Sequence, residues 1–136
     1  MVNLPSGWWR YFAASLSGSP IPNPRGSIIK IRETFVCEPL RTPVGKFGGA
    51  YREVDATFLG AAVVSGLLQR SGLPAEAVDD VLFAQGYASM EAPALGRMVA
   101  LDAGLPITVA GLQLDRRCCS GLQALIYAYL QVATGA

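Results

Sequence analysis

Apolar and polar positions follow two periods along residues 28–136. Between Asp55 and Arg70, apolar side chains return every fourth residue at Leu59, Val63 and Leu67, which is the spacing of one helix face. Asp55 is suited to begin this helix and Gly72 to end it. Two further segments show helical patterns, 93–106, which closes at Gly104 and Pro106, and 119–136.

Three shorter apolar runs have the composition of strands. "TFVCEPL" at 34–40 is rich in β-branched and apolar residues, and a Gly/Pro loop, "RTPVGKFGG", follows it. "DDVLFAQGY" at 79–87 begins with continuous apolar positions, as in a strand that is covered on both faces. "VAGLQLD" at 109–115 is the third. These patterns predict strands at all three places.

The expected order of elements is β-α-β-α-β-α. Each connection is long enough to join parallel strands, so the order predicts an α/β layered fold with a mostly parallel sheet. The last helix runs into Thr134, Gly135 and Ala136, where a further parallel strand would normally follow. We therefore interpret 28–136 as one domain that is truncated before its later strands.

Residues 1–27 differ from the rest in composition. The segment contains "SPIPNPRGS" and no acidic residue, and the first acid is Glu33. Its apolar stretch, "GWWRYFAASLSG", is short and broken by Arg10, which argues against a signal-peptide core. We interpret 1–27 as an extension that is disordered or a weak targeting segment.

Composition and charge exclude several classes of function. The 51% hydrophobic and 15% charged content is typical of a folded domain, and a net charge of +1 gives no nucleic-acid footprint. No apolar run approaches the roughly 20 residues that cross a bilayer, so we expect no membrane partner. Three cysteines without histidine are too few ligands for a usual zinc site and an odd number for disulfides. These counts predict no metal and a reducing, cytoplasmic setting.

The adjacent cysteines Cys118 and Cys119 fall between the third expected strand and the third expected helix. The amino end of a helix carries about half a positive charge, which favours a thiolate, and its N–H groups can bind an oxyanion. Burial in the core is the alternative, because free cysteine is among the most buried residue types. A disulfide between neighbours would close a strained ring. Position alone leaves nucleophile and packing both open.

Several separated motifs resemble the N-terminal half of thiolases, the acetyl-CoA acyltransferases. They are "CEPLRTPVGKFGG", "PALGRMVALDAGLP" and "LDRRCCSGLQALIYAYLQVATG", in that order, and the likeness covers 31–136. The resemblance implies a partial thiolase-like half-domain. We interpret the loop "RTPVGKFGG", which follows the first expected strand, as structural. We expect Arg97 in the second helix to be solvated or paired with an acid.

The thiolase motif Asn-x-x-Cys-x-Ser-Gly places its nucleophile at Cys118, with Ser120 and Gly121 in their expected positions. The resemblance implies that this thiol takes an acyl group from acyl-CoA before a Claisen condensation, or before the reverse cleavage of a 3-ketoacyl-CoA. It implies no cofactor, since coenzyme A thioesters are the substrates. Family members are homodimers or homotetramers.

Two residues depart from the motif: Asp115 stands where Asn is usual, and Cys119 where a smaller residue is usual. The family's other catalytic segments, Gly-His-Pro, Cys-x-Gly-Gly and Asn-Glu-Ala-Phe, are missing from this sequence, as is the loop domain that holds coenzyme A. We therefore expect the 136-residue chain alone to be inactive. The alternatives are a ketoacyl-synthase relative and a non-catalytic fragment or interaction module.

Overall fold

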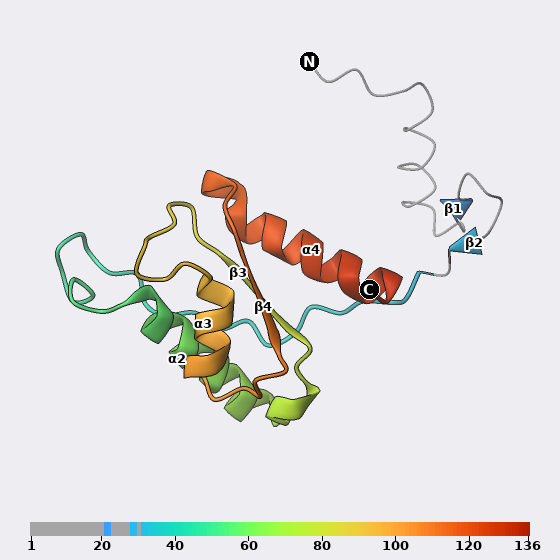
Figure 1. Cartoon of the computed structure of the whole chain (residues 1–136), viewed down its shortest axis with the longest axis horizontal. Coiled ribbons are helices and arrows are strands. Elements are labelled where there is room, and N and C mark those ends of the chain that lie inside the picture. The colour runs from blue at the N-terminus through green and yellow to red at the C-terminus, as the bar shows by residue number, and fades with distance from the viewer. Residues whose placement is uncertain (1–20, 23–27, 30) are drawn as a thin grey trace, which may run out of the picture. The chain divides into compact units, whose positions relative to one another are not determined.

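The structure, a computed structural model, describes residues 21–22, 28–29 and 31–136 (Figure 1). The interpretation of 1–27 as an extension lies outside the described residues, apart from Ile21–Pro22. That pair forms β1 and pairs antiparallel with β2 (Ile28–Ile29), with Ile21 opposite Ile29. The larger of two compact units, Phe35–Ala128, contains both strands of the second sheet and the turn with the adjacent cysteines.

This second sheet has two parallel strands, β3 (Asp80–Ala84) and β4 (Ala110–Leu114). Asp80 pairs with Ala110 at one end and Ala84 with Leu114 at the other. The strands are joined by a crossover that contains α3 (Leu95–Asp102), as parallel strands require (Figure 1). The sequence predictions at 79–87, 93–106 and 109–115 are therefore confirmed, with the observed elements shorter at both ends.

The helix predicted from Asp55 to Arg70 is α2 (Ala56–Ser71). Asp55 occupies the cap position, but its side chain makes no capping hydrogen bond. Gly72 ends the helix with φ +68°, and its N–H donates to the carbonyl oxygen of Leu68 at 2.9 Å. This left-handed geometry is the reason that glycine is favoured after a helix. A short 3-10 helix, η1 (Ala75–Ala77), leads from there to β3.

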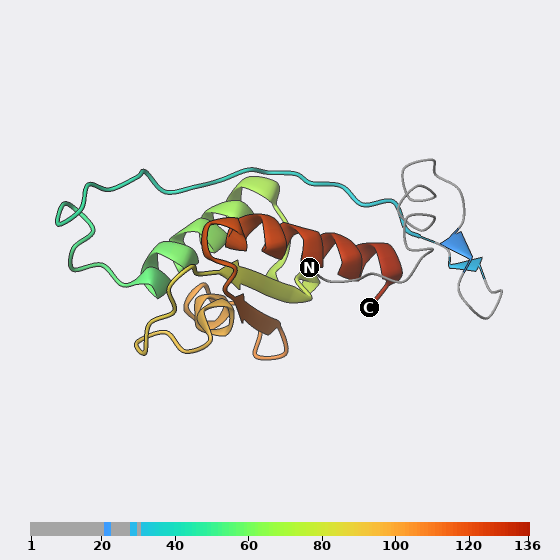
Figure 2. The same cartoon turned by 90° about the horizontal axis from the view of Figure 1, so that it is seen from above.

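The core lies around α3, which packs against both strands of the sheet and against α2 (Figures 1 and 2). Val99 of α3 is completely buried, and Phe83 of β3 packs against the cluster from the sheet. The buried apolar residues of this cluster are Val81, Ala92, Leu95, Val99, Ala100, Leu105 and Val109. Burial of these side chains from two layers is what holds the sheet and helices together.

The strand predicted at 34–40 is wrong. These residues form no ladder, and Glu38 has φ +53°, which lies outside the range of a strand. Side chains hold the segment instead: Nε of Arg70 lies 2.7 Å from Oε2 of Glu38, and Leu40 reaches Gly66 of α2. A β-rich segment becomes a strand only when a neighbouring backbone pairs with it, and among the described residues none does.

The last helix, α4 (Ser120–Thr134), confirms the prediction at 119–136. Its large apolar side chains are unusually open to solvent, with Leu122 at 61% exposure, Leu125 at 46% and Ile126 at 41%. Ala124 is its buried position in the Phe35–Ala128 unit, together with Ser120 at the first turn. Within the described part of the chain, no helix combines the length and apolar character needed to span a membrane.

Candidate active site

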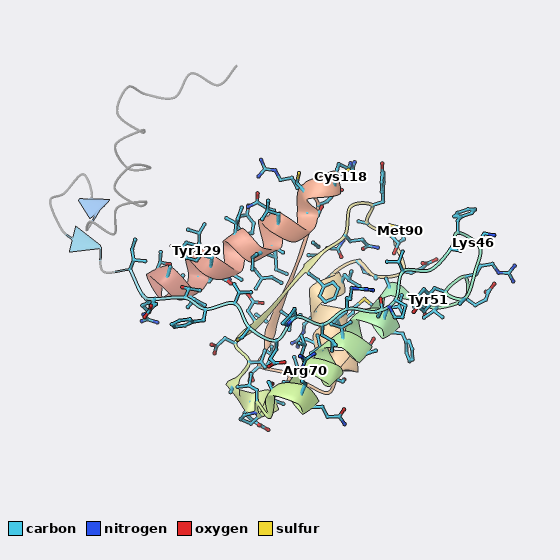
Figure 3. All side chains as sticks on the ribbon, turned by 180° about the vertical axis from the view of Figure 1, so that it is seen from behind. Lys46, Tyr51, Arg70, Met90, Cys118 and Tyr129 are labelled. Atoms are coloured by element: carbon cyan, nitrogen blue, oxygen red, sulfur yellow. The ribbon has the colours of Figure 1, made fainter. Side chains whose placement is uncertain are left out.

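Cys118 lies in a one-turn 3-10 helix, η2 (Arg117–Cys119), that joins β4 to α4. Figure 3 shows Cys118 where α4 begins. Both Cys118 and Cys119 are exposed. Neither cysteine is buried in the core of the described part of the chain, and the Cys118 thiol lies open at the amino end of a helix. Its role as a nucleophile stays a prediction.

Ser120 fixes the shape of this turn. Its side chain is 4% exposed, and its Oγ accepts a hydrogen bond from the backbone N–H of Arg116 at 2.7 Å. The same hydroxyl donates to the carbonyl oxygen of Arg117, also at 2.7 Å. The buried Ser120 hydroxyl thus satisfies the N–H of Arg116 and the carbonyl group of Arg117, the two residues before Cys118. These two hydrogen bonds stabilise a turn that has few backbone hydrogen bonds of its own.

Arg117 has the left-handed backbone conformation, with φ +51°. Few residues other than glycine adopt it, because the Cβ approaches the backbone. Asp115 supports this geometry: its Oδ1 accepts a hydrogen bond from the N–H of Arg117 at 2.8 Å. Its Oδ2 forms an ion pair with the guanidinium of the same residue.

The Arg117 guanidinium also reaches the loop that follows β3. Nη1 donates to the carbonyl oxygen of Gly86 at 2.7 Å, and the guanidinium carbon lies 4.9 Å from the ring centre of Tyr87. A Cβ added at Gly86 would lie 3.3 Å from the carbonyl oxygen of Arg117. The small residue therefore permits a close approach between the loop after β3 and the turn after β4, at the carboxyl edge of the sheet.

Both arginines before Cys118 have side-chain partners. The Arg117 guanidinium is paired with the Asp115 carboxylate, and Nη1 of Arg116 donates to Oε1 of Gln123 in α4. The positive charge of Arg117 is therefore balanced by Asp115, whereas Arg116 keeps its charge because Gln123 is neutral. The amino end of α4 remains as the electrostatic feature common to both cysteines.

This arrangement can support nucleophilic chemistry by sulfur. An exposed thiol stands at a helix start, and Gly121 is so open that an added Cβ would meet no atom within 4 Å. The first turn of α4 is therefore free of crowding at Gly121. Among residues 21–22, 28–29 and 31–136, no three His, Cys, Asp or Glu side chains gather as ligands for a metal.

Two hollows on the Phe35–Ala128 unit are lined by residues outside this turn. One of about 610 Å³ runs along α2 and includes Asp102, and one of about 460 Å³ lies in the loop before α2. Neither has Cys118 in its lining. Both hollows are shallow and neither is lined by a cysteine, so the turn with the adjacent cysteines remains the candidate for thiol chemistry.

Arg97 has a different role from the one expected. Its Nη2 donates to the carbonyl oxygen of Ile107 at 2.9 Å, and its Nη1 donates to that of Val109. The side chain thus holds the chain just before β4 through backbone carbonyls. The expectation of a solvated or acid-paired arginine is corrected, because the helix places Arg97 beside carbonyl groups that the sheet does not use.

Sequence reasoning missed the contribution of Gly86 and Tyr87. The available signal was a glycine directly after an apolar strand, a position where backbones often approach closely. Nothing in the linear sequence joined that glycine to the turn 31 residues later. Their proximity follows from the parallel pairing, since Ala84 and Leu114 end their strands side by side.

Comparison with known proteins gives consistent results. The family model described as "Thiolase, N-terminal domain" matches residues 34–136. The Escherichia coli (strain K12) protein named 3-oxoadipyl-CoA/3-oxo-5,6-dehydrosuberyl-CoA thiolase is 40% identical over 107 residues, covering 77% of this chain and 27% of that protein. The acetyl-CoA acetyltransferase of Yarrowia lipolytica is 32% identical over 111 residues, covering 82% of this chain and 28% of that protein.

A solved structure is also similar. The crystal structure of the Bacillus anthracis acetyl-CoA acetyltransferase matches with a TM-score of 0.68 and 34% identity, over 71% of this chain and 24% of that chain. This match confirms the expected α/β half-domain. The chain spans about a quarter of the length of these relatives.

Proposed function

Because the chain belongs to the thiolase family, we propose that it supplies the cysteine that accepts the acyl group of an acyl-CoA, and that this cysteine is Cys118. The observation that carries the proposal is the exposure of Cys118 in the turn that begins α4, at the position of the family's nucleophile. Cys119 is also exposed but stands one residue beyond that position.

In the first step, the thiolate sulfur of Cys118 attacks the carbonyl carbon of the acyl-CoA thioester. A carbon–sulfur bond to Cys118 forms, and the bond to the coenzyme A sulfur breaks, so that the acyl group moves and coenzyme A leaves as a thiolate that takes a proton. Neither oxidation nor reduction occurs. The helix start favours the attacking thiolate and stabilises negative charge on the carbonyl oxygen.

In the second step of the family's reaction, the α-carbon of another acyl-CoA attacks the thioester and releases a 3-ketoacyl-CoA. This step needs a base to remove the α-proton. The chain has no histidine, and the carboxylate closest to Cys118 in sequence, Asp115, is engaged by Arg117. We therefore propose that the 136-residue chain alone forms the acyl-cysteine slowly but does not complete the cycle.

Protection from alkylation tests the first step. The full chain is incubated with acetyl-CoA and then with iodoacetamide at neutral pH, and peptide mass spectrometry follows each cysteine separately. We expect acetyl-CoA to slow the alkylation of Cys118, whereas desulfo-coenzyme A, which carries no acyl group, leaves it unchanged. Equal protection of Cys118 and Cys119, or protection by both ligands, would contradict the assignment.

A second candidate function is that of a non-catalytic interaction module. The specific observation in its favour is the exposed apolar surface of α4, formed by Leu122, Leu125, Ile126 and Tyr127. Monomeric proteins rarely expose such a contiguous set. A chain that self-associates through α4 and gives no acyl adduct on Cys118 would favour this reading, and it would leave the family membership intact.

Coenzyme A and its acyl thioesters are the proposed partners, with no bound cofactor, and assembly into homodimers or homotetramers would follow the family's habit. A ketoacyl-synthase type of reaction would differ in requiring a carrier-bound or decarboxylating second substrate. Release of CO₂ from malonyl-CoA in the presence of an acyl-CoA would indicate that activity.

A further inference from the structure

We propose that Asp115 is a positioning residue for Cys118, acting through the left-handed conformation of Arg117. The inference rests on the proposed function only in naming Cys118 as the nucleophile. Asp115 does not touch the thiol in any contact described above. It acts on the residue immediately before Cys118, whose φ of +51° determines the direction in which the chain enters η2.

The Asp115 carboxylate uses both of its oxygens on Arg117. Oδ1 accepts the backbone N–H at 2.8 Å, and Oδ2 pairs with the guanidinium. The backbone contact joins residues two apart, which is the usual Asx-turn pattern and tolerates a left-handed neighbour. The side-chain contact folds the arginine back over the same turn. Backbone and side chain of Arg117 are thus held by one group.

The far end of the Arg117 side chain is held by the loop after β3. Nη1 donates to the Gly86 carbonyl oxygen at 2.7 Å, and the guanidinium lies over the Tyr87 ring at 4.9 Å. A guanidinium at this distance from an aromatic face is attracted to the ring. The Asp115–Arg117 pair therefore connects the turn that carries Cys118 to the neighbouring loop at the same edge of the sheet.

This connection gives a reason for aspartate at a position where the thiolase motif usually has asparagine. An asparagine oxygen could accept the Arg117 N–H but would leave the guanidinium charge unbalanced. Aspartate supplies both the acceptor and the opposite charge. Asp115 thus balances the charge of Arg117 and accepts its backbone N–H, so the two residues act together in this chain.

The pair is needed because arginine resists the left-handed conformation. For a residue with a Cβ, the population of the left-handed conformation is lower than that of the right-handed one by roughly 5- to 30-fold. Without Asp115, we expect the turn to relax and the Cys118 thiol to leave its place at the amino end of α4. Glycine at 117 would adopt the same φ without support.

The test is a double-mutant cycle on the full chain. The variants are Asp115→Ala, Asp115→Asn, Arg117→Gly and the combination of Asp115→Ala with Arg117→Gly. Site-resolved iodoacetamide rates are measured for Cys118, with Cys37 in each chain as the internal reference. Circular dichroism checks that each variant keeps its helical signal. The control Glu53→Gln removes an acid from an exposed pair in the loop before α2.

We expect Asp115→Ala to lower the Cys118 rate, relative to Cys37, by about fivefold or more, and Asp115→Asn to lower it less. In the Arg117→Gly background, Asp115→Ala should change the ratio by less than about twofold, because glycine no longer needs the carboxylate. A merely stabilising role for Asp115 would give no such rescue.

The proposal is overturned if Asp115→Ala leaves the ratio unchanged, or if its effect is equally large in the Arg117→Gly background. The measurement uses alkylation and no acyl-CoA. If the cycle behaves as expected but acetyl-CoA never acylates Cys118, then the proposed function fails and the positioning role stands. If acetyl-CoA acylates Cys118 but the cycle does not behave as expected, then the positioning role fails and the proposed function stands.

Discussion

Gly111 of β4 lies directly against Gly96 of α3, with no side chain between the two backbones. A Cβ added at Gly111 would come within 2.6 Å of the carbonyl carbon of Gly96. A Cβ added at Gly96 would in turn overlap the carbonyl oxygens of Val81 and Leu112, one in each strand. Helix α3 therefore rests on the sheet itself, and the position of the turn after β4 depends on this contact.

The first prediction concerns that contact. Gly96→Ala should lower the free energy of unfolding by about 2 kcal/mol or more, because the new methyl group meets backbone that cannot move aside. Gly121→Ala in α4 is the matched control, since its added Cβ meets nothing and alanine favours a helix by up to about 1 kcal/mol. Urea unfolding followed by circular dichroism measures both. Equal stability of the two variants would contradict the packing described here.

The sequence was sufficient for most of the fold. The helical period at Leu59, Val63 and Leu67 was enough to predict α2, but these three side chains are only half-buried, and Val64 and Leu68 are the α2 residues that pack against the core. The apolar runs near Val81 and Leu112 likewise predicted β3 and β4, where Val81 is buried and Leu112 is exposed. The patterns of α3 and α4 were predictable in the same way. The strand expected at 34–40 failed for a different reason. Its composition is suitable, but strand formation depends on a partner backbone, and composition carries no information about that partner.

The second prediction concerns Arg97. Arg97→Ala should lower the free energy of unfolding by about 2 kcal/mol, because the carbonyl groups of Ile107 and Val109 lose a charged donor. Arg97→Lys should recover part of this, since one ammonium cannot reproduce a two-pronged contact. Arg52→Ala, which breaks only the exposed pair with Glu53, should change stability by less than about 0.5 kcal/mol. If Arg97→Ala is as mild as Arg52→Ala, the hydrogen bonds contribute nothing.

The third prediction concerns the exposed surface of α4. The chain should self-associate as its concentration rises, and the combined change Leu122→Glu and Ile126→Lys should weaken this, because it places charges on the apolar stripe. The new pair is four residues apart, so it also supports the helix. Sedimentation velocity at several concentrations measures the effect. Phe47→Ser, at an exposed aromatic residue in the loop before α2, is the control, and equal dissociation by this variant would argue against α4.

The candidate site could not be identified from the positions of its residues in the sequence alone. The position of Cys118 at a helix start left nucleophile and packing open, and the resemblance to the thiolase motif is what favours the nucleophile. The geometry added what neither could provide, which is the set of contacts from Asp115 through Arg117 to Gly86. These residues are distant in sequence or carry ordinary surface charges, so their cooperation becomes visible only when the strands are paired.

The fourth prediction concerns turnover. The 136-residue chain should show no steady thiolysis of acetoacetyl-CoA, because it has no histidine and its acid at 115 is engaged. The assay follows acetyl-CoA formation in the presence of free coenzyme A, with Cys118→Ser as the reference for background. Steady turnover that disappears in Cys118→Ser would show that the chain holds a complete catalytic set.

The central claim, that Cys118 accepts the acyl group, is tested most directly by mapping the acyl group itself. The full chain is incubated with acetyl-CoA carrying an isotopically labelled acetyl group, quenched in acid and digested, and the labelled peptide is fragmented to distinguish Cys118 from Cys119. The account predicts labelled acetyl on Cys118, retained in Cys119→Ser and lost in Cys118→Ser. Label on Cys119 or Cys37 that persists in Cys118→Ser, or no label on Cys118, would contradict it.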